Sequence, residues 1–247
     1  MVSISARTVG RWLKAERLKP WRFQSWLTPK YRASFLEQAC PILDLYERAQ
    51  QHQLAPDEVV FSIDEKTSIQ ARHHPSYRPT GQGEPAHVEH TYERRGAVHL
   101  LASLTVATGV VFGQVYPAKR FAEFSAFLST VLHTAVDQGA RLIHLLLDRG
   151  SLHRPAYLST WLAEHFPHAE IVVHWLPVRS SWLNQVEIFF SILQRQVLMP
   201  NDFRSPWEVA DRIQEFIRFR NEHPHPIQWS YTSEKLRKKY QPERPPS

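Results

Sequence analysis

Cysteine and glycine are scarce in this sequence. Its 247 residues include one cysteine, Cys40, which excludes an internal disulfide and a four-cysteine zinc site. Eight glycines stand against eighteen prolines, and the absence of a glycine-rich phosphate-binding turn argues against a dinucleotide-binding fold and a P-loop. No apolar run reaches the roughly 18 residues of a membrane-spanning helix, and no signal sequence opens the chain. The sequence therefore predicts a soluble, cytoplasmic protein without a membrane partner.

The positive charge is concentrated near the N-terminus. Hydrophobic residues make up 43% of the chain and aromatic residues 12%, which indicates a folded core. The formal net charge is +6, yet residues 1–32 hold eight Lys and Arg with a single acid, so the rest is nearly neutral. A basic block on a neutral body predicts an arm that binds a polyanion. A solvated charged face remains the alternative.

Two helices are predicted before residue 55. Residues 3–19 fit a helix capped by Ser5, with an apolar face formed by Val9, Trp12 and Leu13. Its basic residues lie toward another face: Arg7, Arg11 and Lys14. This arrangement suits the last helix of a helix-turn-helix, cut short because no earlier helix precedes it. Residues 31–53 fit the second helix.

From residue 58 the pattern alternates between strands and helices. Strands are predicted at 58–64, at 97–117 as a hairpin turning at 107–109, at 141–148 and at 170–177. Helices are predicted at 121–139, 155–166, from Ser180 or Ser181 onward, and at 206–221, with a long loop or irregular hairpin at 72–96 and a basic tail after the last helix. This order predicts a mixed α/β sheet with helices on its faces.

Three carboxylates stand out against this background. Asp64 and Asp148 each close a strongly apolar predicted strand, and functional groups gather at the carboxyl ends of parallel strands. Glu187 lies in the run SSWLNQVEIFF, on a mostly apolar helix. At about 100° per residue it sits in the middle of a narrow polar stripe formed by Asn184, Glu187, Ser191, Gln194 and Arg195. The alternatives are turn or capping aspartates and an exposed polar stripe.

A divalent cation would make such a cluster tolerable. Three like charges within a few ångströms repel each other and shift each other's pKa unless a cation joins them. Hard carboxylate oxygens suit Mg²⁺ or Mn²⁺. Two such ions about 4 Å apart are a common apparatus for cleaving phosphodiesters. Asp64, Asp148 and Glu187 are therefore candidate catalytic residues and metal ligands.

Five motifs resemble one family. FSIDEKTSIQ, ERRGAVHLLASLTVATG, LLLDRGSLH, SSWLNQVEIFFSIL and NEHPHPIQW occur in this order, from about residue 58 to 238. They resemble the insertion sequence 630 family of bacterial transposases, which is related to mariner elements and belongs to the Asp-Asp-Glu class. The resemblance implies a ribonuclease H-like catalytic domain at 56–240, with catalytic acids at Asp64, Asp148 and Glu187. A helix-turn-helix remnant and linker at 1–55 and a tail at 241–247 complete the expected division.

The resemblance also implies a reaction and partners. Water attacks the phosphodiester at the end of the element, and the freed 3′-hydroxyl attacks target DNA, commonly at a TA dinucleotide. The implied partners are the element's double-stranded terminal repeats, target DNA and a second copy of the chain, in a bacterial cytoplasm and at the nucleoid when bound. The expected DNA contacts come from the basic arm and the surroundings of the acids: Arg7, Arg11, Lys14, Lys66, Arg149, His153 and Asn184.

One departure from the family pattern keeps alternatives open. Arg149 follows the second aspartate where the family often has asparagine. It would either pair with Asp148 and weaken metal binding or contact a phosphate. Two other functions therefore stay possible: a catalytically impaired DNA-binding remnant of a transposase, and a ribonuclease H-like nuclease of different purpose.

Overall fold

A computed structural model describes residues 4–16, 32–150 and 154–240. The chain divides into two compact units, 1–32 and 33–247. The first contains helix α1 (Ala6–Ala15), whose N-cap Ser5 accepts a hydrogen bond from the Thr8 amide at 3.2 Å. The predicted helix and its cap are thus confirmed, whereas the predicted tail at 241–247 lies outside the described residues.

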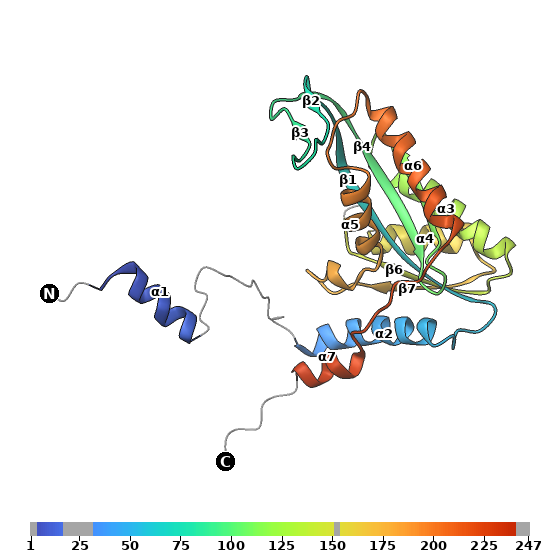
Figure 1. Cartoon of the computed structure of the whole chain (residues 1–247). Helices are drawn as coiled ribbons and strands as arrows, with labels where there is room; N and C mark the ends of the chain where they lie inside the picture. The colour runs from blue at the N-terminus through green and yellow to red at the C-terminus, as the bar shows by residue number, and fades with distance from the viewer. Residues whose placement is uncertain (1–3, 17–31, 151–153, 241–247) are drawn as a thin grey trace, which may run out of the picture. The chain divides into compact units, whose positions relative to one another are not determined.

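A five-stranded mixed sheet forms the centre of the second unit (Figure 1). Its order is β5-β4-β1-β6-β7. Neighbours β5, β4 and β1 are antiparallel, and β1, β6 and β7 are parallel. The bounds are β1 (Glu58–His73), β4 (Glu93–Thr105), β5 (Val111–Tyr116), β6 (Leu142–Leu147) and β7 (Glu170–Trp175). The predicted mixed α/β fold is confirmed.

Strand β1 is longer than the sequence predicts. We expected it to end at Asp64, but it continues to His73 because β4 runs antiparallel beside it, from the pair Phe61–Thr105 to the pair His73–Glu93. Its parallel pairing with β6 ends earlier, at Ser62 and Leu146. Asp64 therefore lies in mid-strand, just beyond the point where the neighbour β6 stops.

Alternating side chains of the sheet face two layers of helices. One face packs on α3 (Phe121–Asp137) and α4 (Pro155–His165), through residues such as Ile63, Phe124 and Leu145. The other face packs on α5 (Val186–Gln196) and α6 (Pro206–Glu222), through residues such as Leu100 and Phe189. Both faces of the sheet are covered, so apolar side chains predominate where β1, β4 and β6 cross the core.

Helix α2 (Arg32–Gln50) belongs to the second unit. Its apolar side packs on Val60 of β1, Leu146 of β6 and Leu183. It also contacts α7 (Ser233–Tyr240), where Phe35 meets Tyr240 edge-on with ring centroids 5.6 Å apart. The basic segment that we expected to be a tail is thus a docked helix. The functional division at residue 56 stays a prediction.

The remaining elements are short. Strands β2 (Tyr77–Arg78) and β3 (His87–Val88) form a small separate sheet in the expected irregular hairpin. The helix that we expected to start at Ser180 or Ser181 is interrupted: η1 (Ser181–Leu183) is a 3₁₀ turn, and α5 begins only at Val186. Ser180 makes no capping bond. No described helix is long and apolar enough to cross a membrane.

Candidate active site

Two acids meet just beyond the point where the parallel pairing of β1 and β6 ends. Ser62 and Leu146 form the last parallel pair, so Asp64 and Asp148 each lie two residues beyond it. Carboxylate oxygens of Asp64, Asp148 and Glu65 all lie within 4.8 Å of one another. The sequence predicted that the first two would converge. Glu65 is an additional member of the cluster.

The turn after β6 fixes Asp148. The Gly150 amide donates to Asp148 Oδ1 at 2.8 Å. A β-carbon at Gly150 would lie 2.9 Å from the same oxygen, closer than real β-carbons approach a neighbour. Glycine is therefore required for this turn to hold the carboxylate where it is. Arg149 between them is exposed, and His153 lies outside the described residues.

Asn184 connects Asp64 to the start of α5. Its Nδ2 donates to Asp64 Oδ2 and to the carbonyl of Ile63, both at 3.0 Å. The Ser62 hydroxyl donates to Asn184 Oδ1 and accepts from the Val186 amide at 2.9 Å, which supplies the cap that Ser180 does not. Asn184 is fully buried. It has no exposed surface for DNA, so a positioning role replaces the contact that we predicted.

Glu187 lies half-buried in the first turn of α5. Its amide donates to the carbonyl of Asn184 at 3.1 Å, so the residue that holds Asp64 also begins this turn. Burial raises the pKa of Glu187; the charge of Lys66 opposes this shift, and those of Asp148 and Glu65 add to it. Glu187 is not part of the group within 4.8 Å, but it is close enough for its charge to act on Asp64.

The electrostatics of Asp64 fit a cation site. Burial, followed by the charges of Asp148, Glu65 and Glu187, raises the pKa of Asp64 to about 7. Among the described residues, no Lys or Arg forms an ion pair with Asp64. A buried carboxylate without a cationic partner is costly when ionised. The oxygens gathered here are the ligand type that Mg²⁺ and Mn²⁺ prefer, so the residues present fit a divalent ion.

Glu65 is the member of the cluster that the sequence did not reveal. It follows Asp64 on the same strand, and neighbouring strand residues point to opposite faces, which argues against a shared site. A carboxylate oxygen of Glu65 nevertheless lies within 4.8 Å of those of Asp64 and Asp148. Its side chain is only 11% exposed, and its Oε1 also lies 3.8 Å from Lys119 Nζ. The consecutive acids of the DEK motif were the only signal for it.

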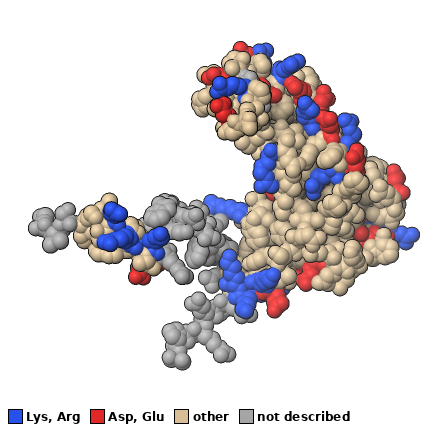
Figure 2. Space-filling model, in the orientation of Figure 1, with Lys and Arg blue, Asp and Glu red and all other residues tan. Residues whose placement is uncertain are grey.

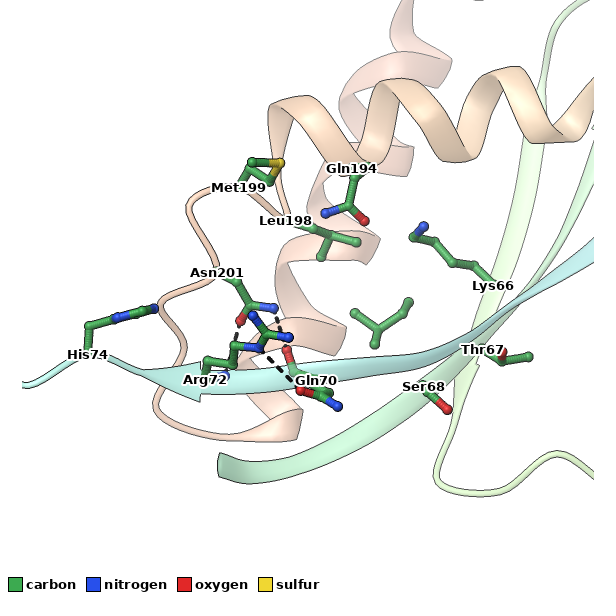
Figure 3. Close-up of a pocket in the computed structure, with 11 residues that line it drawn as sticks. Lys66, Thr67, Ser68, Gln70, Arg72, His74, Gln194, Leu198, Met199 and Asn201 are labelled. Carbon is green, nitrogen blue, oxygen red and sulfur yellow. Dashed lines mark hydrogen bonds between the residues drawn. The ribbon is translucent and has the colours of Figure 1, made fainter. Parts of the chain in front are cut away.

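The other predicted contacts fall in two places. Lys66 lines a cavity beside the acids, between β1 and the end of α5 (Figure 3). Arg7, Arg11 and Lys14 are exposed on α1, where Figure 2 shows a concentration of basic side chains. They belong to the first compact unit.

Comparison with known families gives one match over most of the sheet and its helices. A family model described as DDE superfamily endonuclease matches residues 59–208. This span includes Asp64, Asp148 and Glu187. A comparison with curated proteins finds no match.

Solved structures of a mariner transposase have the same fold. The Mos1 mariner paired-end complex with Mn is similar with a TM-score of 0.55 and 16% identity, over 94% of this chain and 66% of that one. The paired-end complex with Mg is similar with a TM-score of 0.55 and 16% identity, over 95% of this chain and 67% of that one. The Mos1 strand transfer complex is similar with a TM-score of 0.54 and 16% identity, over 87% of this chain and 63% of that one. The chain thus has the ribonuclease H-like fold of these proteins and spans about two thirds of their length.

Proposed function

Because the chain belongs to the DDE superfamily endonucleases, we propose that it is a transposase that cuts DNA at the ends of a mobile element and joins them to target DNA. The observation that carries this proposal is the meeting of Asp64 and Asp148 just beyond the parallel pairing of β1 and β6, with the charge of Glu187 on α5 acting on both. Similarity to Mos1 transposition complexes supports it through the shared fold.

We assign Asp64, Asp148 and Glu187 as the residues that hold two divalent ions, Mg²⁺ or Mn²⁺. When bound, such ions supply Lewis-acid activation and charge stabilisation at a phosphodiester. The protein's own part is to aim the carboxylates. Asn184 fixes Asp64, the Gly150 amide fixes Asp148, and the first turn of α5 places Glu187.

The proposed chemistry has two steps, one at the element's end and one on target DNA. A water oxygen forms a bond to the phosphorus at the element's end, and the bond from phosphorus to the 3′-oxygen breaks, which frees a 3′-hydroxyl. That hydroxyl then attacks a phosphorus of target DNA and displaces the 3′-oxygen of the target nucleotide that was bonded to it. Each step exchanges one P–O bond for another, so no covalent link between protein and DNA is needed.

The finer assignments follow from the motifs quoted above. We propose membership in the insertion sequence 630 group, insertion at TA dinucleotides, and action as a homodimer on two DNA ends in a bacterial cytoplasm. The basic face of α1 would contact the terminal repeats through Arg7, Arg11 and Lys14. This charge is exposed, as binding to DNA requires.

The test is Mn²⁺- or Mg²⁺-dependent nicking of DNA that carries the ends of the encoding element. Glu187→Gln removes one proposed ligand, and Glu164→Gln, on the exposed side of α4, is the matched control. We expect nicking by the wild type and the control and none by Glu187→Gln. Equal nicking by all three would refute the assignment of Glu187. Binding without nicking by any of them would favour the catalytically impaired remnant.

A further inference from the structure

An open cavity of about 410 Å³ lies along the second half of β1, from Lys66 to His74 (Figure 3). Its walls are the second half of β1, the end of α5 and the segment that follows α5. Lys66 lies two residues after Asp64, on the same face of the strand. Gln194 lies seven residues after Glu187, on the same side of the helix. The residues that line the cavity therefore follow Asp64 along β1 and Glu187 along α5.

Two cations in this cavity have no acidic partner among the described residues. Lys66 and Arg72 form no ion pair there, whereas Arg48, Arg95, Arg120 and Arg212 each pair with a glutamate. The charge of Lys66 reaches Glu187, where it opposes the rise in pKa that burial causes. An anion entering the cavity would meet positive charge that is not already neutralised by the protein.

The Arg72 guanidinium is held in place. Its Nε donates to Gln70 Oε1 at 3.2 Å, and its Cζ lies 4.5 Å from the centroid of the Tyr92 ring. The neighbouring backbone is tied to Asn201, which accepts from the Arg72 amide at 3.1 Å and donates to the Gln70 carbonyl at 2.8 Å. A cation fixed in this way loses little side-chain freedom when it binds a ligand.

Two irregularities of β1 shape this wall. The pairing with β4 shifts between Lys66 and Ile69 and again between Gln70 and Arg72, and Ser68 has a positive φ of 54°. Bulges of this kind re-aim side chains beside functional sites. Here Ile69 packs in the core and forms part of the cavity floor, while Lys66 and Arg72 add charged groups to the same wall.

The row of donors has the dimensions of a nucleic-acid strand. Lys66 and Arg72 are six positions apart on β1, which spans at most roughly 20 Å at about 3.3 Å per residue. One strand of B-DNA has a phosphate about every 3.4 Å of helix axis. The cavity is open, and the chain has no glycine-rich loop to enclose a single nucleotide.

We propose that this cavity, lined by Lys66, Arg72 and Gln194, binds the sugar–phosphate backbone of one DNA strand next to the phosphodiester held at the acids. The inference rests on the proposed function and adds a second binding site, distinct from the basic face of α1. Lys66 contacts the phosphates nearest the acids, Arg72 contacts phosphates farther along the same strand, and Gln194 donates from the helix side.

Salt dependence of DNA binding tests the proposal. Affinity for element-end DNA is measured without divalent ions from 50 to 300 mM salt, for the wild type, Lys66→Gln with Arg72→Gln, Arg72→Lys and the surface control Arg212→Gln. Each lost phosphate contact lowers the slope of log affinity against log salt by about 0.9, so we expect the double variant to lose about 1.8. Arg72→Lys and Arg212→Gln keep the wild-type slope. An unchanged slope in the folded double variant overturns the proposal.

A crosslink locates the strand. Cys40 is buried, so Gln194→Cys supplies the accessible thiol among the described residues. We expect it to crosslink to DNA with a thiol-bearing phosphate within about six nucleotides of the cut, on one side only. Equal crosslinking along the whole DNA contradicts the site. A local crosslink in a protein that does not nick would leave this site standing and refute the proposed chemistry, whereas nicking without a local crosslink would refute this site alone.

Discussion

Asn184 Nδ2 and Asp64 Oδ2 lie 3.0 Å apart in a buried hydrogen bond. This contact joins the strand that carries the first acid to the helix that carries the third. The same side chain donates to the Ile63 carbonyl and accepts from the Ser62 hydroxyl, so both of its N–H groups are used. The relative position of Asp64 and Glu187 therefore depends on one asparagine.

Replacing Asn184 is expected to weaken both folding and metal binding. Asn184→Ala leaves buried polar groups without partners, so the free energy of unfolding should fall by about 3 kcal/mol. Loss of a residue that orients a metal ligand should also reduce Mn²⁺ affinity at least about tenfold. Urea denaturation and Mn²⁺ titration measure the two effects.

Asn221→Ala is the matched control for this change. Asn221 makes two hydrogen bonds to the backbone of Val111, at 3.0 and 2.7 Å, on another part of the sheet. Its loss should destabilise the fold by about 2 kcal/mol and leave Mn²⁺ affinity unchanged. If both variants bind Mn²⁺ as the wild type does, Asn184 is only a structural residue.

Metal binding should release a proton below neutral pH. The pKa of Asp64 is about 7, well above the ordinary 3.8, because burial and three neighbouring acids disfavour its charge. At pH 6 the ion must displace this proton, so about one proton is released per binding event, and at pH 8 almost none. Calorimetry in buffers of different ionisation enthalpy gives the count. Equal release at both pH values would contradict the shift.

The same shift sets the pH dependence of the metal-free fold. A raised pKa means that the folded state holds the proton more tightly than the unfolded chain. The stabilisation from Asp64 is present at pH 4 and lost as the pH rises through about 7. Thermal unfolding with and without Mn²⁺ should therefore diverge most above pH 7. A constant difference from pH 5 to 8 would count against it.

Gly150→Ala should impair catalysis more than stability. The new β-carbon would lie 2.9 Å from Asp148 Oδ1 and push the carboxylate aside. Misplacing a catalytic group by about 1 Å costs on the order of 100-fold in rate, whereas this turn lies outside the core, so unfolding should change by less than about 1 kcal/mol. Nicking rates and urea denaturation measure both. Gly81→Ala, whose nearest atom would be 3.9 Å away, is the control.

Helix α2 should be required for the sheet to fold. Its apolar side covers Val60, Leu146 and Leu183, and the hydroxyl of Tyr46 donates to the Leu183 carbonyl at 2.6 Å. A chain of residues 33–247 should unfold cooperatively, and one of residues 56–247 should not, because it exposes this apolar surface. Calorimetry compares the two. Equal melting temperatures would place the structural boundary at residue 56.

The strand-end acids could be predicted from sequence, and the residues around them could not. Asp64 and Asp148 follow apolar strands, and parallel strands bring their carboxyl ends together, so local pattern was sufficient. The extension of β1 to His73 depends on pairing with β4, which is remote in sequence. The burial of Asn184 depends on Ser62 and Asp64, more than a hundred residues away. Its place in a polar stripe suggested an exposed residue instead.

Under the proposed function, the length of β1 has a consequence for where DNA would be cut. Asp64 and Arg72 belong to one continuous strand that pairs with β4 on both sides of its two irregularities, so the spacing between them is fixed by the fold. A DNA backbone bound at Arg72 would therefore place a phosphate at a fixed distance from it next to the acids. Inserting one residue between them would turn the following side chains to the opposite face of the sheet. The number of residues between Asp64 and Arg72 would then help to set the position of cleavage, together with the DNA sequence.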